Sequence, residues 1–256
     1  MDALDSAHAK ISWAKKHLDA FDSEADAFLA RKPYTVVREP QFAIGHNRYR
    51  LYVRERPPET LALLAGDCVH NAKSALDHVA WQLAGANPED TGTQFPIFAD
   101  ETKFATAKRQ YQLIPARPLA VIKYLQPYRR PQPLDDLLWV IYALDNADKH
   151  KIMAVGLGMA EPAPSITGPP WSHTHFNVHF VVGPFEGDAV IGDITAYAVP
   201  RAGGPPNDNV KVDVEFTFGV ALRDPITDLV VLFAARDLRN AVTRAEAVVE
   251  MFARYL

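Results

Sequence analysis

The spacing of hydrophobic residues changes along this 256-residue chain, and the change limits the folds open to it. Near the N-terminus, Ile11, Ala14, Leu18 and Phe21 recur at steps of three and four residues, which is the period of one helix face. Between residues 174 and 222, hydrophobic and polar residues alternate, which is the period of a half-buried strand. A helical period then returns to the C-terminus. The pattern therefore predicts an α+β fold.

The predicted elements follow from these periods and from the glycine and proline breaks between them. We expect a helical bundle of about four long helices, and we expect a β-hairpin inserted early and a small antiparallel sheet inserted late. We expect one domain over residues 1–256, because the last helix can bury its hydrophobic face most readily on the first three. The bounds are 5–31, 57–85, 134–151 and 226–255 for the helices, 34–56 for the hairpin and 174–222 for the sheet.

Charge and composition exclude several classes of protein. The net charge of −4 and the pI near 6.1 give no general attraction for nucleic acid, so any RNA contact must be local. One cysteine, Cys68, excludes an intrachain disulfide and a zinc site made only of thiolates, and it falls on a helix's hydrophobic side, where we expect a packed thiol. The chain has no uninterrupted apolar run of 18 residues and opens acidic and polar. We therefore expect no membrane partner, no signal peptide and a cytoplasmic location.

An unusual polar stretch, HNAKSALDH, covers residues 70–78 of the second predicted helix. Its polar side chains share an arc of roughly 120° with neighbours on the same helix. This arc is either the solvent face of an amphipathic helix or a buried or cleft-lining face. Short polar groups that are poor helix formers favour the second interpretation. The arc contains Asp67, His70, Asn71, Ser74, Asp77, His78 and Trp81.

A second polar stretch, LDNADKHK, ends the helix predicted at 134–151. Asp148 continues that helix's hydrophobic stripe and Asp145 lies at its edge. A carboxylate in such a place must be paired, metal-bound or protonated, unless the helix ends before it. Since the other helix offers His70, His78 and Lys73 as partners, we expect a site between the two helices.

These blocks carry a resemblance to known proteins. GDCVHNAKSALDHVAWQLA, TQFPIF, LQPY and LDNADKHK resemble an uncharacterised bacterial family of actinobacterial type with HNLRSALDH, FPI, QPY and DKHR blocks, over about residues 8–151. The central block also distantly resembles the HEPN superfamily of helical-bundle proteins, many of them RNases in defence or toxin systems. Their motif is an arginine followed by a histidine, and Lys73 and His78 occupy those positions here. The resemblance implies RNA as partner and a homodimer.

Three hypotheses follow for the function. In the first, a metal-independent endoribonuclease without a cofactor, His78 is the general acid or base on a ribose 2′-OH and Lys73 stabilises the phosphate charge. His70 and Asn71 then position the RNA backbone, and Asp77 or Asp148 orients a histidine.

The second hypothesis is a bundle enzyme that uses a divalent Mn, Fe or Zn ion. Asp67 and His70 are spaced so that they can share one ion, and Asp148 with His78 or His150 would complete the site. The third is a non-enzymatic protein whose polar stripe is a buried network that fixes the register of the helices.

A further group of histidines lies in HTHFNVHF. His173, His175 and His179 alternate onto one face of a predicted strand. Three such histidines can bind a metal. Because phenylalanine and valine take the other face, we expect these histidines to point to solvent.

Overall fold

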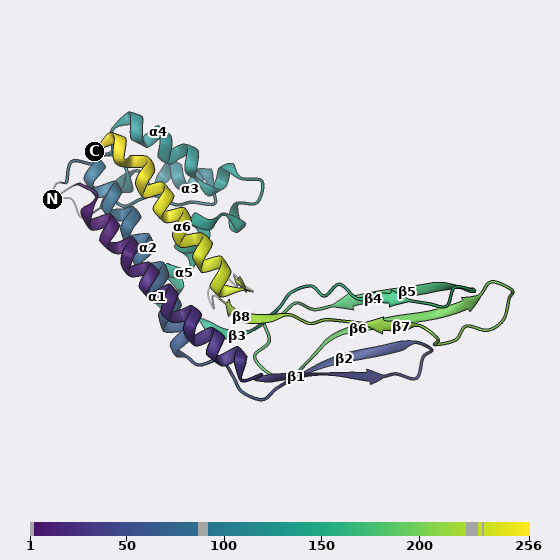
Figure 1. Cartoon of the computed structure of the whole chain (residues 1–256). Helices are drawn as coiled ribbons and strands as arrows, with labels where there is room; N and C mark the ends of the chain where they lie inside the picture. The colour runs from purple at the N-terminus through teal and green to yellow at the C-terminus, as the bar shows by residue number, and fades with distance from the viewer. Residues whose placement is uncertain (1–2, 87–91, 224–229, 232) are drawn as a thin grey trace.

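The computed structural model describes residues 3–86, 92–223, 230–231 and 233–256. Helices gather at one end of the molecule, and long strands extend away from them as an arm (Figure 1). Both termini lie at the helical end, far from the tip of the arm. We call the α-helices together the helical part. We call the strands of the arm the sheet arm, with β1 Tyr34–Pro40, β2 His46–Val53, β4 Ser165–Thr167, β5 Ser172–Phe180, β6 Ala189–Pro200 and β7 Lys211–Asp213.

The helical part differs from the predicted bundle of four long helices, which is wrong. Three long helices occur among the described residues, α1, α2 and α6, whereas α5 has only 12 residues and two further short helices join them. The bounds are α1 Asp5–Ala30, α2 Thr60–Leu83, α3 Glu101–Thr106, α4 Ala116–Leu125, α5 Leu137–Asp148 and α6 Ala234–Phe252, with 3-10 turns at Lys108–Gln110, Pro127–Arg129, Pro133–Asp135 and Ala253–Tyr255.

Local chemistry explains where two of the predicted helices were too long. Asp136 accepts a hydrogen bond from the backbone N–H of Leu138, so this cap and the preceding prolines start α5 at Leu137 rather than at 134. The helix predicted at 226–255 starts only at Ala234, after the short strand β9 Val230–Val231. Residues 226–229 lie outside the described residues. A short apolar run such as LVVLF suits a strand as well as a helix, so the spacing of its hydrophobic residues could not distinguish the two.

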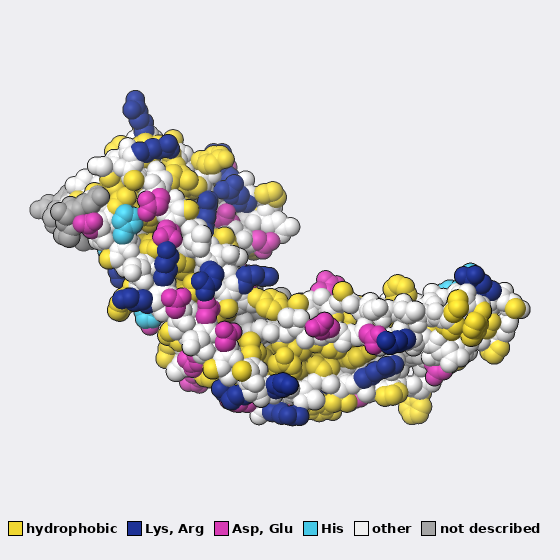
Figure 2. All heavy atoms as spheres, viewed as in Figure 1, with side chains coloured by type: hydrophobic (Ala, Val, Ile, Leu, Met, Phe, Trp, Pro, Cys, Tyr) yellow, Lys and Arg dark blue, Asp and Glu magenta, His cyan; other side chains and the backbone are white. Residues whose placement is uncertain are grey.

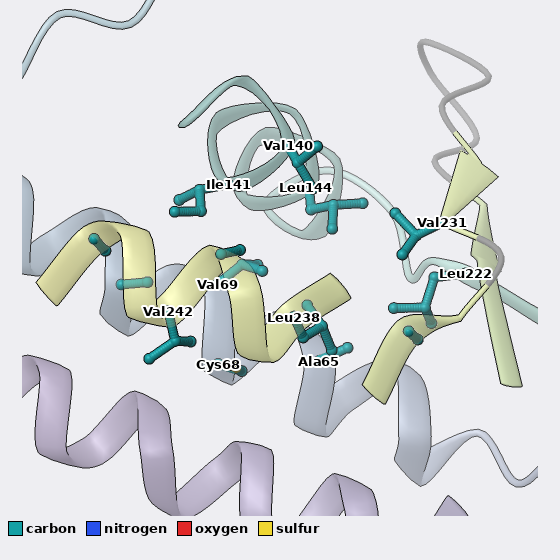
Figure 3. Packing of buried hydrophobic residues seen from close by; sticks show 14 of the residues in the cluster. Ala65, Cys68, Val69, Val140, Ile141, Leu144, Leu222, Val231, Leu238 and Val242 are labelled. Atoms are coloured by element: carbon teal, nitrogen blue, oxygen red, sulfur yellow. The ribbon is translucent and has the colours of Figure 1, made fainter. Parts of the chain in front are cut away.

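Helix α2 lies in the middle of the helical part, in contact with α1, α5 and α6. The hydrophobic stripe predicted for residues 5–31 is buried against it, from Ile11 to Phe28. On the other side of α2, Val69 and Ala65 meet side chains of α5 and α6 (Figure 3). Cys68 is fully buried in this core, as expected for a packed thiol, and burial raises its pKa to about 12.

The sheet arm is built on a four-stranded antiparallel sheet with the strand order β1-β2-β6-β5. The predicted hairpin is present as β1 Tyr34–Pro40 and β2 His46–Val53. It does not stand alone, because β2 pairs with β6 Ala189–Pro200, and β6 pairs on its other edge with β5 Ser172–Phe180. The separate small sheet predicted at 174–222 is therefore wrong.

Two smaller sheets complete the strands. β3 Ala154–Met159 pairs with β8 Phe218–Arg223, which also pairs with β9, and β4 Ser165–Thr167 pairs with β7 Lys211–Asp213. One face of the four-stranded sheet is buried, and its aromatic residues Tyr49 and Phe180 contact Phe216. Figure 2 shows hydrophobic side chains along the middle of the arm, with charged side chains beside them.

None of the described helices combines the length and the apolar character that crossing a membrane requires.

Candidate functional site

His70 of α2 and Asp145 of α5 form the closest contact between the two polar stretches. Nδ1 of His70 lies 2.9 Å from Oδ1 of Asp145. The Asp145 side chain is only 2% exposed, whereas the His70 side chain is 49% exposed. Because an ionised carboxylate only accepts hydrogen bonds, it holds the proton of the imidazole on Nδ1 and leaves Nε2 free to accept a proton. The pairing expected from the sequence is confirmed for these two residues, which we call the dyad.

Lys149 is a second basic group in contact with the carboxylate of Asp145. Its Nζ lies 2.5 Å from Oδ2 of Asp145, so each carboxylate oxygen contacts a different basic group. Lys149 follows α5 directly and is half exposed, one helical turn after Asp145. The buried carboxylate is thus paired, as a charge in such a place must be.

Asp148 is the last residue of α5 and rests on α2 at Gly66. A Cβ atom on Gly66 would lie 2.2 Å from Oδ1 of Asp148, so glycine is what lets the carboxylate approach this closely. Burial raises the pKa of Asp148, and the charges of Asp67 and Asp145 raise it further. His70 and Lys149 oppose this shift without cancelling it.

Asn71 connects α2 to α1. Its Nδ2 donates to the backbone oxygen of Asp67 at 2.8 Å, and its Oδ1 accepts from Nζ of Lys10 at 3.2 Å. Asp67 itself is exposed and lies 3.7 Å from Nδ1 of His17. Asn71 is only 6% exposed, and these contacts join two helices at a fixed register.

Lys73 and Asp77 form a separate ion pair. Nζ of Lys73 lies 2.5 Å from Oδ1 of Asp77, and the Lys73 side chain is 7% exposed. The same carboxylate oxygen accepts the backbone N–H of Phe95 at 2.9 Å, which ties the segment after α2 to the helix. The geometry gives this pair a structural contact, so the ammonium of Lys73 is not directed at solvent.

His78 is half-buried, and its Nδ1 is buried with no hydrogen-bond partner among the described residues. It does not pair with Asp145 or Asp148, although the sequence offered both as partners. Ser74 and Trp81 are also half-buried. The predicted arc is therefore mostly covered, and only Asp67 and His70 are exposed on it.

The residues of the alternative metal site do not form one group. Within the described ranges, no three His, Cys, Asp or Glu side chains are arranged to hold a metal ion. Asp67 and His70 act electrostatically on Asp148, but His150 is exposed beyond the end of α5. The carboxylates here face His70 and Lys149, which compete with a cation for them.

The sequence did not predict the contacts that three residues make in this site. The spacing of Lys149 from Asp145 was a readable signal, since residues four apart on a helix are neighbours. Gly66 and Lys10 gave no such signal, because their roles depend on how α2 meets α5 and α1.

Comparison of the chain with protein-family models, with curated protein sequences and with solved structures finds no match.

Proposed function

We propose that this chain binds RNA and cleaves it without a metal ion, using His70 as the general base. The observation that carries the proposal is the dyad: a buried carboxylate 2.9 Å from the Nδ1 atom of a half-exposed imidazole. A histidine oriented in this way by a carboxylate is a common general base. The choice of RNA comes from the resemblance of the central block to HEPN proteins.

The proposed reaction uses groups that RNA itself supplies. Nε2 of His70 takes the proton of a ribose 2′-OH, and the 2′-oxygen attacks the adjacent phosphorus. The bond from phosphorus to the 5′-oxygen breaks, and that oxygen takes a proton from water. The products are a 2′,3′-cyclic phosphate and a 5′-hydroxyl. Asp145 stabilises the imidazolium that forms on His70.

This proposal moves the acid–base role from His78 to His70. Nδ1 of His78 is buried and unpaired among the described residues, and Lys73 is held by Asp77. His70 combines exposure with an orienting carboxylate. In this site Asn71 fixes α2 against α1.

The experiment compares wild-type protein with H70A, D145N and H8A on 5′-labelled single-stranded and hairpin RNAs, in buffer containing EDTA. His8 is a matched control, an exposed histidine that contacts Glu250. We expect H70A to lose about 100-fold or more of the cleavage rate, which is the contribution typical of a general base. D145N should lose activity and change its pH profile, and H8A should cleave like wild type.

The proposal is wrong if wild-type protein leaves every RNA intact, or if H70A, folded by circular dichroism, cleaves at the wild-type rate. Loss of wild-type activity in EDTA alone would favour the metal-dependent alternative. The resemblance adds a homodimer to the proposal, for which light scattering should give twice the 28.4 kDa of one chain.

A further inference from the structure

The outer face of the four-stranded sheet, the face turned away from the buried aromatic residues, collects histidines from two distant segments of the sequence, β2 and β5. The sequence already placed His173, His175 and His179 on one side of β5, and all three are exposed. In the register of the sheet, His175 lies opposite Tyr197 of β6, and His46 of β2 lies opposite Thr195. Four of the nine histidines in the chain therefore share this face.

With neutral histidines, the charged groups on the face carry one net negative charge, because three carboxylates face two arginines. Nε of Arg48 and Nε2 of His46 each lie 3.1 Å from the same oxygen, Oδ1 of Asp193. Nε of Arg50 lies 3.0 Å from Oε1 of Glu39. The groups that face the histidines are thus Glu39 of β1, Arg48, Arg50 and Tyr52 of β2, Asp188 just before β6, and Asp193 and Tyr197 of β6.

A pair of stacked rings lies on the same face, with His175 exposed and Tyr197 half-buried. The rings of His175 and Tyr197 are stacked, with centroids 5.3 Å apart and planes 16° from parallel. Flat rings on an exposed sheet are the surfaces on which the bases of single-stranded nucleic acids stack, whatever their sequence. Basic groups beside such a pair can contact the phosphates.

We propose that this outer face binds single-stranded RNA, and that binding strengthens as its histidines gain charge. The inference rests on the proposed function for the identity of the ligand, and it adds a substrate-binding surface separate from the dyad. The occupant follows from the chemistry of the face. Imidazole is the side chain whose ordinary change of charge lies nearest neutral pH, so protonation of the four histidines turns the net charge of the face from negative to positive. Phosphates then neutralise the added charge, and bases stack on the rings.

The experiment measures fluorescence anisotropy with a 12-nucleotide oligouridylate at pH 6 and pH 8, in a H70A background so that the probe stays intact. We expect binding about 10-fold tighter at pH 6 than at pH 8. Replacing His173, His175 and His179 together by alanine should remove most of this difference. Y197A should weaken binding about 5-fold or more, as loss of one stacked base predicts, whereas Y197F should bind normally. H8A is the control for a histidine elsewhere.

A variant with a gain in affinity sharpens the test. D193N removes the carboxylate that holds His46 and Arg48, so both become available to phosphate. We expect D193N to bind the probe more tightly than its background at pH 8, and added salt should weaken that binding.

The possible results separate this inference from the proposed function. RNA binding that depends on the histidines, in a protein that cleaves no RNA, would support RNA binding by the outer face and overturn catalysis by the dyad. Cleavage by wild type, with binding unchanged in the triple histidine variant, would overturn RNA binding by the outer face and leave the catalytic role of the dyad standing. Binding of vesicles containing phosphatidylserine, but not of RNA, would also overturn the inference, because the occupant would then be a lipid surface.

Discussion

Asp145 and Asp148 lie about one helical turn apart on α5 and have opposite electrostatic surroundings. Asp145 contacts two basic groups, one at each oxygen. Asp148 lies beside Gly66, and the carboxylates of Asp67 and Asp145 act on it. Two identical side chains can therefore have different roles, since the neighbours and not the residue type decide where charge is favoured.

The raised pKa of Asp148 predicts a change of stability with pH. The folded chain holds this proton more tightly than the unfolded chain, so stability is lost as pH rises from the ordinary aspartate pKa through the raised one. D148N removes the ionisable group, and with it this loss of stability, and it nearly keeps the shape of the side chain. We expect D148N to unfold at a higher urea concentration than wild type at pH 7, with the difference disappearing near pH 3.5. D135N, at an exposed aspartate, is the control and should show no such gain. Equal midpoints for D148N and wild type at pH 7 would contradict this account.

The pair of Lys73 and Asp77 predicts an unequal effect of removing each partner. D77A leaves a buried ammonium without its carboxylate, which costs about 3 kcal/mol of unfolding free energy. K73M removes the charge and keeps a long side chain, and Asp77 retains the N–H of Phe95. We expect K73M to cost clearly less than D77A, and the double variant to be more stable than D77A alone, in urea unfolding. A larger loss in K73M would show that Lys73 has another partner.

At the scale of elements, the sheet arm depends on one central strand. β6 is the longest described strand, and it pairs with β2 on one edge and β5 on the other. The turn between β1 and β2 is attached to it as well, because the N–H of Ala196 donates to the oxygen of Gly45 at 3.0 Å. Gly45 has a φ of +67° there, a conformation that glycine adopts at little cost.

The attachment predicts that G45A damages the sheet more than a similar change elsewhere. A Cβ atom on Gly45 would lie 1.9 Å from the backbone oxygen of Ala196, so the turn must move away from β6. Gly203 has a similar φ of +85°, but a Cβ there would meet nothing within 4 Å. We expect hydrogen exchange in β2 and β6 to speed up markedly in G45A and little in G203A, which carries backbone strain only. Equal exchange in the two variants would rule out the steric cause.

At the scale of the whole molecule, the helical part and the sheet arm share one continuous core. Buried residues run without interruption from α1 and α2, through β8, to Leu51 and Ile194 in the arm. A domain boundary falls where few contacts cross. One domain over residues 1–256 stays a prediction.

A shared core predicts that both ends of the molecule unfold together. Far-UV circular dichroism follows the helices, and Trp171, next to β5 in the arm, gives a fluorescence signal when the other three tryptophans are replaced by phenylalanine. We expect the two signals to have the same urea midpoint. A transition of Trp171 at lower urea would instead mean that the arm unfolds by itself.

The sequence predicted best what depends on a single element. The period of residues 5–31 placed α1 within one residue at its C-terminal end and identified its buried stripe, and the complementary charges predicted the contact of His70 with Asp145. The sequence did not predict contacts between segments that are far apart in the chain. Nothing near residue 46 shows that β2 pairs with a strand almost 150 residues later. The burial of Lys73 was hidden too, because a lysine in a polar motif suggests solvent until its packing is known.

The packed thiol of Cys68 has a practical consequence for all of these measurements. A maleimide reacts with an exposed thiolate, and Cys68 is fully buried with a pKa of about 12. It is also the only cysteine in the chain. A new cysteine placed on either end of the molecule should therefore take up a dye alone, without first removing the natural one. The native protein is in this sense ready for distance measurements between its helices and the tip of its arm.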